Sequence, residues 1–120
     1  MANNPELSII ILNYNTKKFL ADCLASIKRY EDEVSLEVIV SDNASSDGSI
    51  EMVREKFPST KVLSGENVGF AKGNNRAKLI IRGEMILFLN RLGGQVHQLF
   101  ATLSVSYILF PYFIILLVTL

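Results

Sequence analysis

The sequence has few of the residues that several specialised protein classes need. It contains one cysteine, one histidine and no tryptophan among 120 residues. The single Cys23 excludes an internal disulfide and a Cys/His metal cluster, and it agrees with a reducing compartment. Twelve basic and twelve acidic side chains balance to a net charge of zero. We therefore expect a single domain with no nucleic acid partner.

The first apolar run is not expected to be a secretory signal. The apolar run Leu7 to Leu12 is too short for one and follows a polar segment. We expect the first ninety residues to be cytoplasmic.

Acidic residues are absent after Glu84, and no charged residue of either sign occurs from Leu99 to Leu120. At about 1.5 Å per residue, this hydrophobic segment (99–120) is long enough to cross a hydrocarbon core of about 30 Å. It is predicted as a helix, kinked at Pro111, that anchors the chain to the cytoplasmic membrane. A frameshifted tail unrelated to the preceding domain is the alternative.

Residues 1–92 show strand and helix signals in alternation. Apolar runs, rich in β-branched residues in the first two, predict strands at 7–12, 36–41, 61–64 and 85–89. Apolar residues at three- and four-residue spacing predict helices between them, over 16–29, 46–57 and 70–81. A βαβαβαβ order requires right-handed crossovers and gives a parallel α/β sheet covered on both faces. Ligands of such sheets bind at the carboxyl ends of the strands.

Polar loops follow the first two predicted strands. Asn13-Tyr14-Asn15 offers amides and an aromatic ring on which a nucleobase could stack. Asp42 is an acceptor-only group suited to the donor edge of a base or to ribose hydroxyls, and the segment from Asn43 through Ser45 to Gly48 can wrap a ligand. The alternative is a turn and capping loop, with Ser46 or Asp47 capping the next helix.

A third polar block begins the third predicted helix. It runs from Asn67 to Asn75 and includes Gly69, Phe70 and Asn74. Backbone N–H groups at a helix start favour an anion, and glycine lets a diphosphate or ribose approach closely. The alternative is that Gly69 only relieves a turn and Phe70 only fills the core.

In order and spacing, three blocks resemble the N-terminal half of family 2 glycosyltransferases with the GT-A fold, especially rhamnosyltransferase-like members. The blocks are residues 7–15, 38–48 and 66–75. The resemblance implies a Rossmann-like half-domain that binds a nucleoside diphosphate sugar. Asp42 would contact the base or ribose, the Asn13–Asn15 loop would lie beside the base, and Asn67–Asn74 would border the ribose and diphosphate.

The same resemblance implies transfer of a sugar to a hydroxyl acceptor, a glycan or lipid-linked saccharide. Complete relatives are expected to hold a divalent metal, Mg or Mn, on an acidic motif after the fourth strand. Here Leu89-Asn90 is followed by Arg91-Leu92-Gly93, so neither that acid nor a later catalytic carboxylate is present. We assign no catalytic and no metal-binding residue, and we expect the truncated domain to be incomplete for catalysis.

Two other functions stay open. A non-catalytic, membrane-tethered nucleotide-binding or interaction protein would explain the missing acidic motif. A sugar nucleotidyltransferase or dehydrogenase would need a glycine-rich loop after the first strand, and Asn13-Tyr14-Asn15 has no glycine. Under the main hypothesis, Asp42→Ala abolishes uridine nucleotide binding and leaves the fold largely intact, because Asp42 is expected in a loop.

Overall fold

A computed structural model describes residues 3–90 and 118–119. Strands and helices alternate along the chain, as the apolar pattern predicts. The strands are β1 (Leu7–Asn13), β2 (Leu36–Asn43), β3 (Lys61–Gly65), β4 (Met85–Asn90) and β5 (Val118–Thr119). The helices are α1 (Lys17–Lys28), α2 (Ser49–Lys56), α3 (Gly69–Asn75) and the 3₁₀ helix η1 (Arg76–Leu79).

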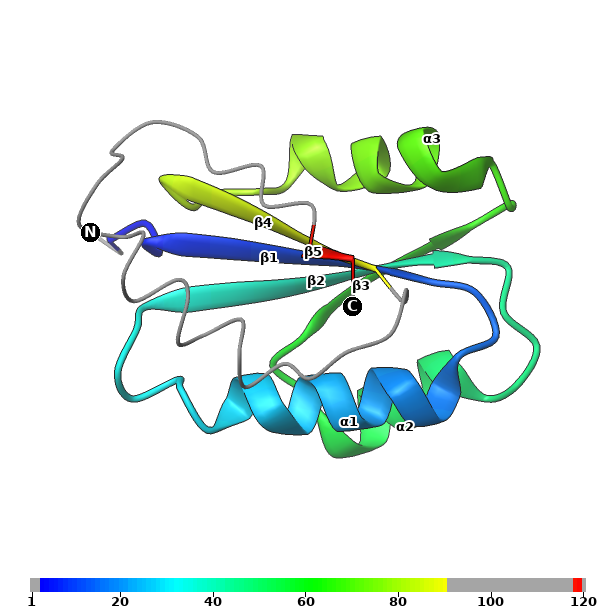
Figure 1. Ribbon diagram of the computed structural model, residues 1–120, viewed down its shortest axis with the longest axis horizontal. Coiled ribbons are helices and arrows are strands. Elements are labelled where there is room, and N and C mark those ends of the chain that lie inside the picture. Colours follow the sequence, from blue (N-terminus) through cyan, green and yellow to red (C-terminus); the bar gives the residue numbers. More distant parts are fainter. Residues whose placement is uncertain (1–2, 91–117, 120) are drawn as a thin grey trace.

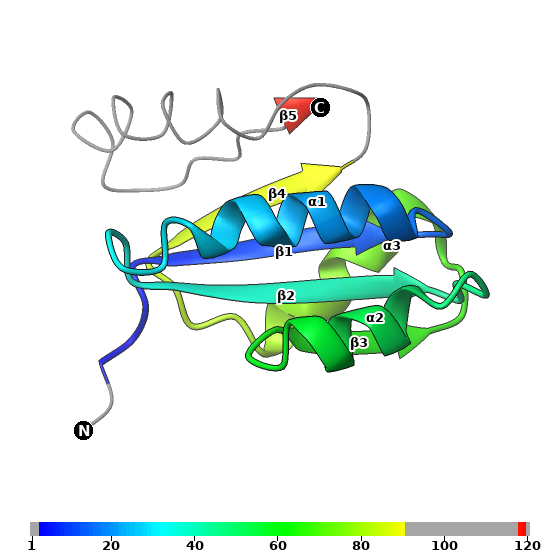
Figure 2. The ribbon, with the colours of Figure 1, turned by 90° about the horizontal axis from the view of Figure 1, so that it is seen from below.

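All neighbouring strands run parallel, in the order β3-β2-β1-β4-β5. The register aligns Asn13 of β1 with Asp42 of β2, and Asn43 of β2 with Gly65 of β3. The carboxyl ends of β1, β2 and β3 therefore meet at one edge of the sheet (Figure 2). This edge is named the carboxyl edge below, and the opposite end of the same strands is the amino edge.

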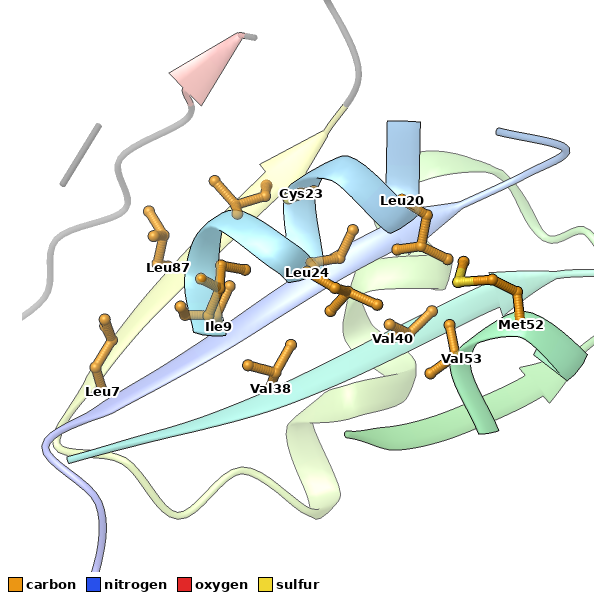
Figure 3. Packing of buried hydrophobic residues seen from close by; sticks show 13 residues of the cluster. Leu7, Ile9, Leu20, Cys23, Leu24, Val38, Val40, Met52, Val53 and Leu87 are labelled. Carbon is orange, nitrogen blue, oxygen red and sulfur yellow. The ribbon is translucent and has the colours of Figure 1, made fainter. Parts of the chain in front are cut away.

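Helices cover both faces of the sheet (Figure 1). α1 and α2 lie on one face, and α3 with η1 lies on the other. The larger apolar cluster fills the space between α1, α2 and strands β1, β2 and β4 (Figure 3). A smaller cluster of Ile10, Ile39 and Ala77 lies under η1. The expected parallel α/β sheet is confirmed.

The third helix differs from the expected 70–81. The α-helix ends at Asn75 and tightens into η1, where the N–H of Ile80 donates to the carbonyl of Ala77 at 3.1 Å. The two residues that follow η1, Ile80 and Ile81, are β-branched, and such residues are poor at prolonging a helix. The tighter turn leaves Ala77 fully buried against the sheet.

A polar cluster closes the amino edge. Glu37, 8% exposed, accepts hydrogen bonds from the Ser8 hydroxyl at 2.6 Å, the Arg82 N–H at 2.6 Å and the Lys61 ammonium at 2.8 Å. Burial raises the pKa of this carboxyl, but the three donors outweigh burial and lower the pKa to about 2. The Ser8 hydroxyl also accepts from the N–H of Gly83. A Cβ on Gly83 would lie 2.5 Å from atoms of Ser8, so a glycine is needed at this position. The cluster joins the chain before β4 to β1, β2 and β3.

Most of the hydrophobic segment predicted over 99–120 lies outside the described residues, so its helical form stays a prediction. Val118–Thr119 forms β5, which pairs with Leu89–Asn90 of β4. Within the described part of the chain, no helix is long and apolar enough to cross a membrane.

Candidate functional site

The side chains of β2 alternate between the two faces of the sheet, and this alternation divides the carboxyl edge into two halves. Val38 and Val40 belong to the cluster under α1 and α2, whereas Ile39 belongs to the cluster under η1. With a period of two, Asp42 points to the α1/α2 side and Asn43 points to the α3 side. The hydrogen bonds of both residues follow this division.

On the α1/α2 side, Asp42 organises the two polar loops. Its Oδ1 accepts from Asn13 Nδ2 at 2.7 Å and its Oδ2 from the N–H of Ser45 at 2.9 Å. Asn13 Nδ2 also donates to Ser45 Oγ at 3.1 Å, and Asn13 Oδ1 accepts from the Thr16 hydroxyl at 2.6 Å. The residues expected at the site are therefore brought together, but Asp42 and Asn13 bond to each other.

The expected place of Asp42 in a loop is wrong. Asp42 lies within β2 and is 0% exposed. The Asn13 amide and the Ser45 N–H donate to Asp42 and would lose this acceptor, so Asp42→Ala is expected to destabilise the fold and not to leave it intact. The hydrogen bonds show that Asp42 holds Asn13 and Ser45 in place. A direct contact between Asp42 and a ligand stays a prediction.

The tips of the two loops are also joined. Asn15, at a positive φ of 49°, donates its N–H to Ser45 Oγ at 2.9 Å and accepts at Oδ1 from the N–H of Ser46 at 2.8 Å. Tyr14 stands beside this junction with 52% of its surface exposed. An exposed aromatic ring on an anchored loop is free to stack on a planar ligand.

Asp47 caps two helices at once, which the sequence indicates for only one. Its Oδ2 accepts from the N–H of Lys17 at 2.9 Å at the start of α1, and its Oδ1 accepts from the N–H of Ser49 at 3.0 Å at the start of α2. The Ser49 hydroxyl also donates to Oδ1. Burial raises the pKa of the Asp47 carboxyl. The hydrogen bonds that it accepts lower the pKa by more than burial raises it, so the net shift is downward. Thr16 precedes α1 without capping it, since its hydroxyl is used by Asn13.

The α3 side holds two buried amides with unused acceptors. Asn43, 3% exposed, donates from Nδ2 to the carbonyl of Gly69 at 3.3 Å, and its Oδ1 has no partner among the described residues. Asn74, 6% exposed, also has an Oδ1 without a partner in that part of the chain. Buried acceptors without partners are rare in folded proteins and indicate a missing donor.

Gly73 explains how α3 comes so close to the strands. A Cβ on Gly73 would lie 2.5 Å from Leu12 Cδ1 and 2.9 Å from Asn43 Nδ2. The Ser41 hydroxyl donates to the Gly73 carbonyl at 2.5 Å. Gly73 is thus required for packing, while Gly69, at a φ of 81°, allows the turn into α3. Asn67 supports that turn by accepting from the N–H of Gly69 at 3.1 Å.

Arg76 is a site residue that sequence reasoning missed. One of its guanidinium nitrogens donates to the backbone carbonyl of Asp42 at 2.8 Å, and the other donates to that of Glu66 at 2.7 Å. It therefore fixes the end of β2 relative to the chain that enters α3. Both acceptors are main-chain oxygens, which no sequence motif records.

Other expected features are not tested by the geometry. The side chain of Phe70 lies outside what the structure describes. Within residues 3–90 and 118–119, no group of three or more His, Cys, Asp or Glu side chains could hold a metal ion. The residues that are described thus do not fit the divalent metal of complete relatives, and we derive no chemical step through one.

Comparison with known proteins assigns the family. The sequence profile of Glycosyl transferase family 2 matches residues 8–91, which include strands β2 to β4, nearly all of β1 and both halves of the carboxyl edge. The chain belongs to this family. Its fold is GT-A-like, as the resemblance implies.

Two relatives show how much of a family 2 glycosyltransferase the chain represents. The uncharacterized glycosyltransferase YfnE of Bacillus subtilis (strain 168) is 38% identical over 84 residues, which are 68% of this chain and 21% of that protein. A mannosyltransferase, PcManGT from Pyrobaculum calidifontis, was solved in complex with GDP-Man and Mn2+. It superposes with a TM-score of 0.56 and 30% identity over 70% of this chain and 26% of its own. The chain thus spans about a quarter or less of these relatives.

Proposed function

We propose that the carboxyl edge binds the nucleoside of a nucleoside diphosphate sugar. The observation that carries this proposal is the pair of buried acceptors Asn43 Oδ1 and Asn74 Oδ1, which have no hydrogen-bond partner among the described residues. Leaving such a group unpaired costs about 1–3 kcal/mol, so a ligand that supplies N–H or O–H donors recovers this cost on binding. A nucleoside carries donors of both kinds, on its base and on its ribose hydroxyls.

The other parts of the edge fit the same ligand. The exposed ring of Tyr14 offers a stacking surface beside the tied loops. Asn13, Asp42 and Ser45 form a hydrogen-bonded support that holds these loops in place before the ligand arrives. A preorganised loop loses less entropy on binding. The similar mannosyltransferase binds GDP-Man, which supports a nucleotide sugar as the ligand class.

We further propose that the chain does not transfer the sugar by itself. The departing diphosphate needs its charge neutralised, and the acceptor hydroxyl needs a base. No Asp or Glu follows Glu84, and the described residues lack a metal-binding cluster. The parent reaction would be glycosyl transfer to a glycan or lipid-linked saccharide, and this chain would contribute the donor-binding part.

Isothermal titration calorimetry of the full chain with GDP-mannose and with UDP-glucose tests the proposal. We expect saturable binding of at least one nucleotide sugar, and a loss of about tenfold or more in affinity for Asn43→Ala and for Asn74→Ala. Asn75→Ala is the matched control, because Asn75 is the exposed neighbour of Asn74 on the same helix. Thermal unfolding of each variant checks that the fold persists.

Two outcomes would contradict the proposal. One is the absence of binding to any of the common nucleotide sugars at millimolar concentration. The other is an equal affinity loss in the Asn75 control. The proposal that the chain does not transfer the sugar by itself is tested by incubating it with the donor and an acceptor and analysing the products. Release of free nucleotide that requires the acceptor would refute that proposal.

A further inference from the structure

The outward surface of α3 and η1 is an unusual combination of basic and apolar side chains. Five of its exposed residues form what is named the α3–η1 face below: Ala71, Lys72, Asn75, Lys78 and Leu79. Leu79 is 94% exposed, more than Tyr14 and Val68, the other exposed large hydrophobic residues in the described part of the chain. A single exposed leucine is common on protein surfaces, so Leu79 indicates a partner only in combination with the charge around it.

The charge around Leu79 has one sign. From residue 67 to residue 83, the sequence has four basic and no acidic side chains, in a chain whose net charge is zero. Arg76 is used inside the site and Arg82 lies near Glu37, with 3.6 Å from Nε to Oε2. Lys72 and Lys78 remain exposed, and neither is paired with a carboxylate in the described part of the chain.

The opposite layer has a different surface. α1 and α2 carry acidic residues among the basic ones, and Lys18 is paired with Asp22 at 2.9 Å on α1. The two layers lie on opposite faces of the sheet (Figure 1). Among the described residues, unpaired lysines together with an exposed leucine therefore occur on the α3–η1 side of the sheet.

We propose that the α3–η1 face docks on an anionic lipid bilayer. Lys72 and Lys78 contact the lipid phosphates, and Leu79 enters the boundary between headgroups and acyl chains. Lysines near a negatively charged membrane surface and an apolar side chain inserted between them are the two contributions that hold peripheral proteins on membranes. A protein partner is less favoured, because lysine is depleted at the centres of protein interfaces.

The absence of tryptophan makes a direct test available. Leu79→Trp places a single fluorophore on the proposed face, and Ala25→Trp places one on an exposed position of α1. Full-length variants are mixed with vesicles of phosphatidylglycerol and phosphatidylcholine, or of phosphatidylcholine alone. We expect a blue shift of the Leu79→Trp emission with the anionic vesicles only, and no shift for Ala25→Trp.

Cosedimentation with the same vesicles tests the charges. The double variant Lys72→Gln/Lys78→Gln is expected to lose about fivefold in membrane partitioning per removed charge. The control variant Lys28→Gln/Lys56→Gln, on α1 and α2, should change the partitioning less than about twofold. Any membrane contact made elsewhere in the chain is common to both variants.

Three results would overturn the inference. They are an unshifted Leu79→Trp spectrum, equal shifts at both tryptophan positions, and equal losses for the two double variants. A concentration-dependent blue shift without vesicles would assign the face to a second copy of the chain instead. No nucleotide enters these assays, so their outcome is independent of the proposed donor site.

Discussion

The buried carboxylate of Glu37 gives the sharpest prediction about stability. It accepts from Ser8, Lys61 and the Arg82 N–H at the amino edge, far along the strands from the candidate site. Glu37→Gln keeps the shape of the side chain but removes its charge and places an NH₂ group among these donors. We expect the variant to fold with reduced stability.

The magnitude follows from the pKa. A shift from 4.5 to about 2 means that the ionised form stabilises the folded state by about 3 kcal/mol relative to the protonated form. Because the folded-state pKa lies below the unfolded one, this stability is present above pH 4.5 and is lost as the pH falls towards 2. Near pH 3 about half of it should remain.

Guanidinium denaturation of the full chain and of Glu37→Gln, at several pH values between 7 and 2.5, measures the difference. We expect a gap of about 3 kcal/mol at pH 7 that narrows to about half at pH 3. Glu55→Gln, on the exposed side of α2, is the control and should lie within about 0.5 kcal/mol of the parent. A gap below 1 kcal/mol at pH 7, or one that does not change with pH, would refute the reasoning.

Three further substitutions test the carboxyl edge. Asp42→Ala should lower the free energy of unfolding by about 2–3 kcal/mol in urea denaturation, because it leaves the buried Asn13 amide without its main acceptor, and an unchanged midpoint would contradict this role. Ala44→Gly should stabilise by about 0.5 kcal/mol in the same assay, since Ala44 has a φ of 60°, and destabilisation would show that the strain is not there. Gly73→Ala should cost about 1–3 kcal/mol and weaken nucleotide binding in calorimetry, because its Cβ would displace Asn43, and full retention of affinity would contradict the packing argument.

The architecture could be predicted from the sequence because its signals are local. β-branched runs, helical spacing and polar loops fix the βαβαβαβ order, and that order leaves the parallel sheet as the solution. The same order places Asn13 and Asp42 at one edge, which the register confirms. The third helix differs from its prediction because its apolar spacing continues through Ile80 and Ile81, whereas the chain tightens into η1 before these two β-branched residues.

The sequence predicts which residues share the carboxyl edge, but not how they contact one another. Extending β2 by two residues to Asn43 would have revealed that Asp42 faces α1 and α2, since Val38 and Val40 share its face. The burial of Asp42 and the double cap by Asp47 arise from pairs about thirty residues apart in sequence. Such side-chain pairings depend on three-dimensional packing, which a linear motif does not encode.

A nuclear magnetic resonance titration of the full chain with a nucleotide sugar is the most direct test of the donor-binding proposal. We predict saturable shifts of the Asn43 and Asn74 side-chain amides and of backbone signals at 13–15 and 42–46. The Ser8 and Lys61 signals at the amino edge should stay in place. Shifts centred on the amino edge, or no shifts at saturating ligand, would contradict the claim that the carboxyl edge binds the nucleoside.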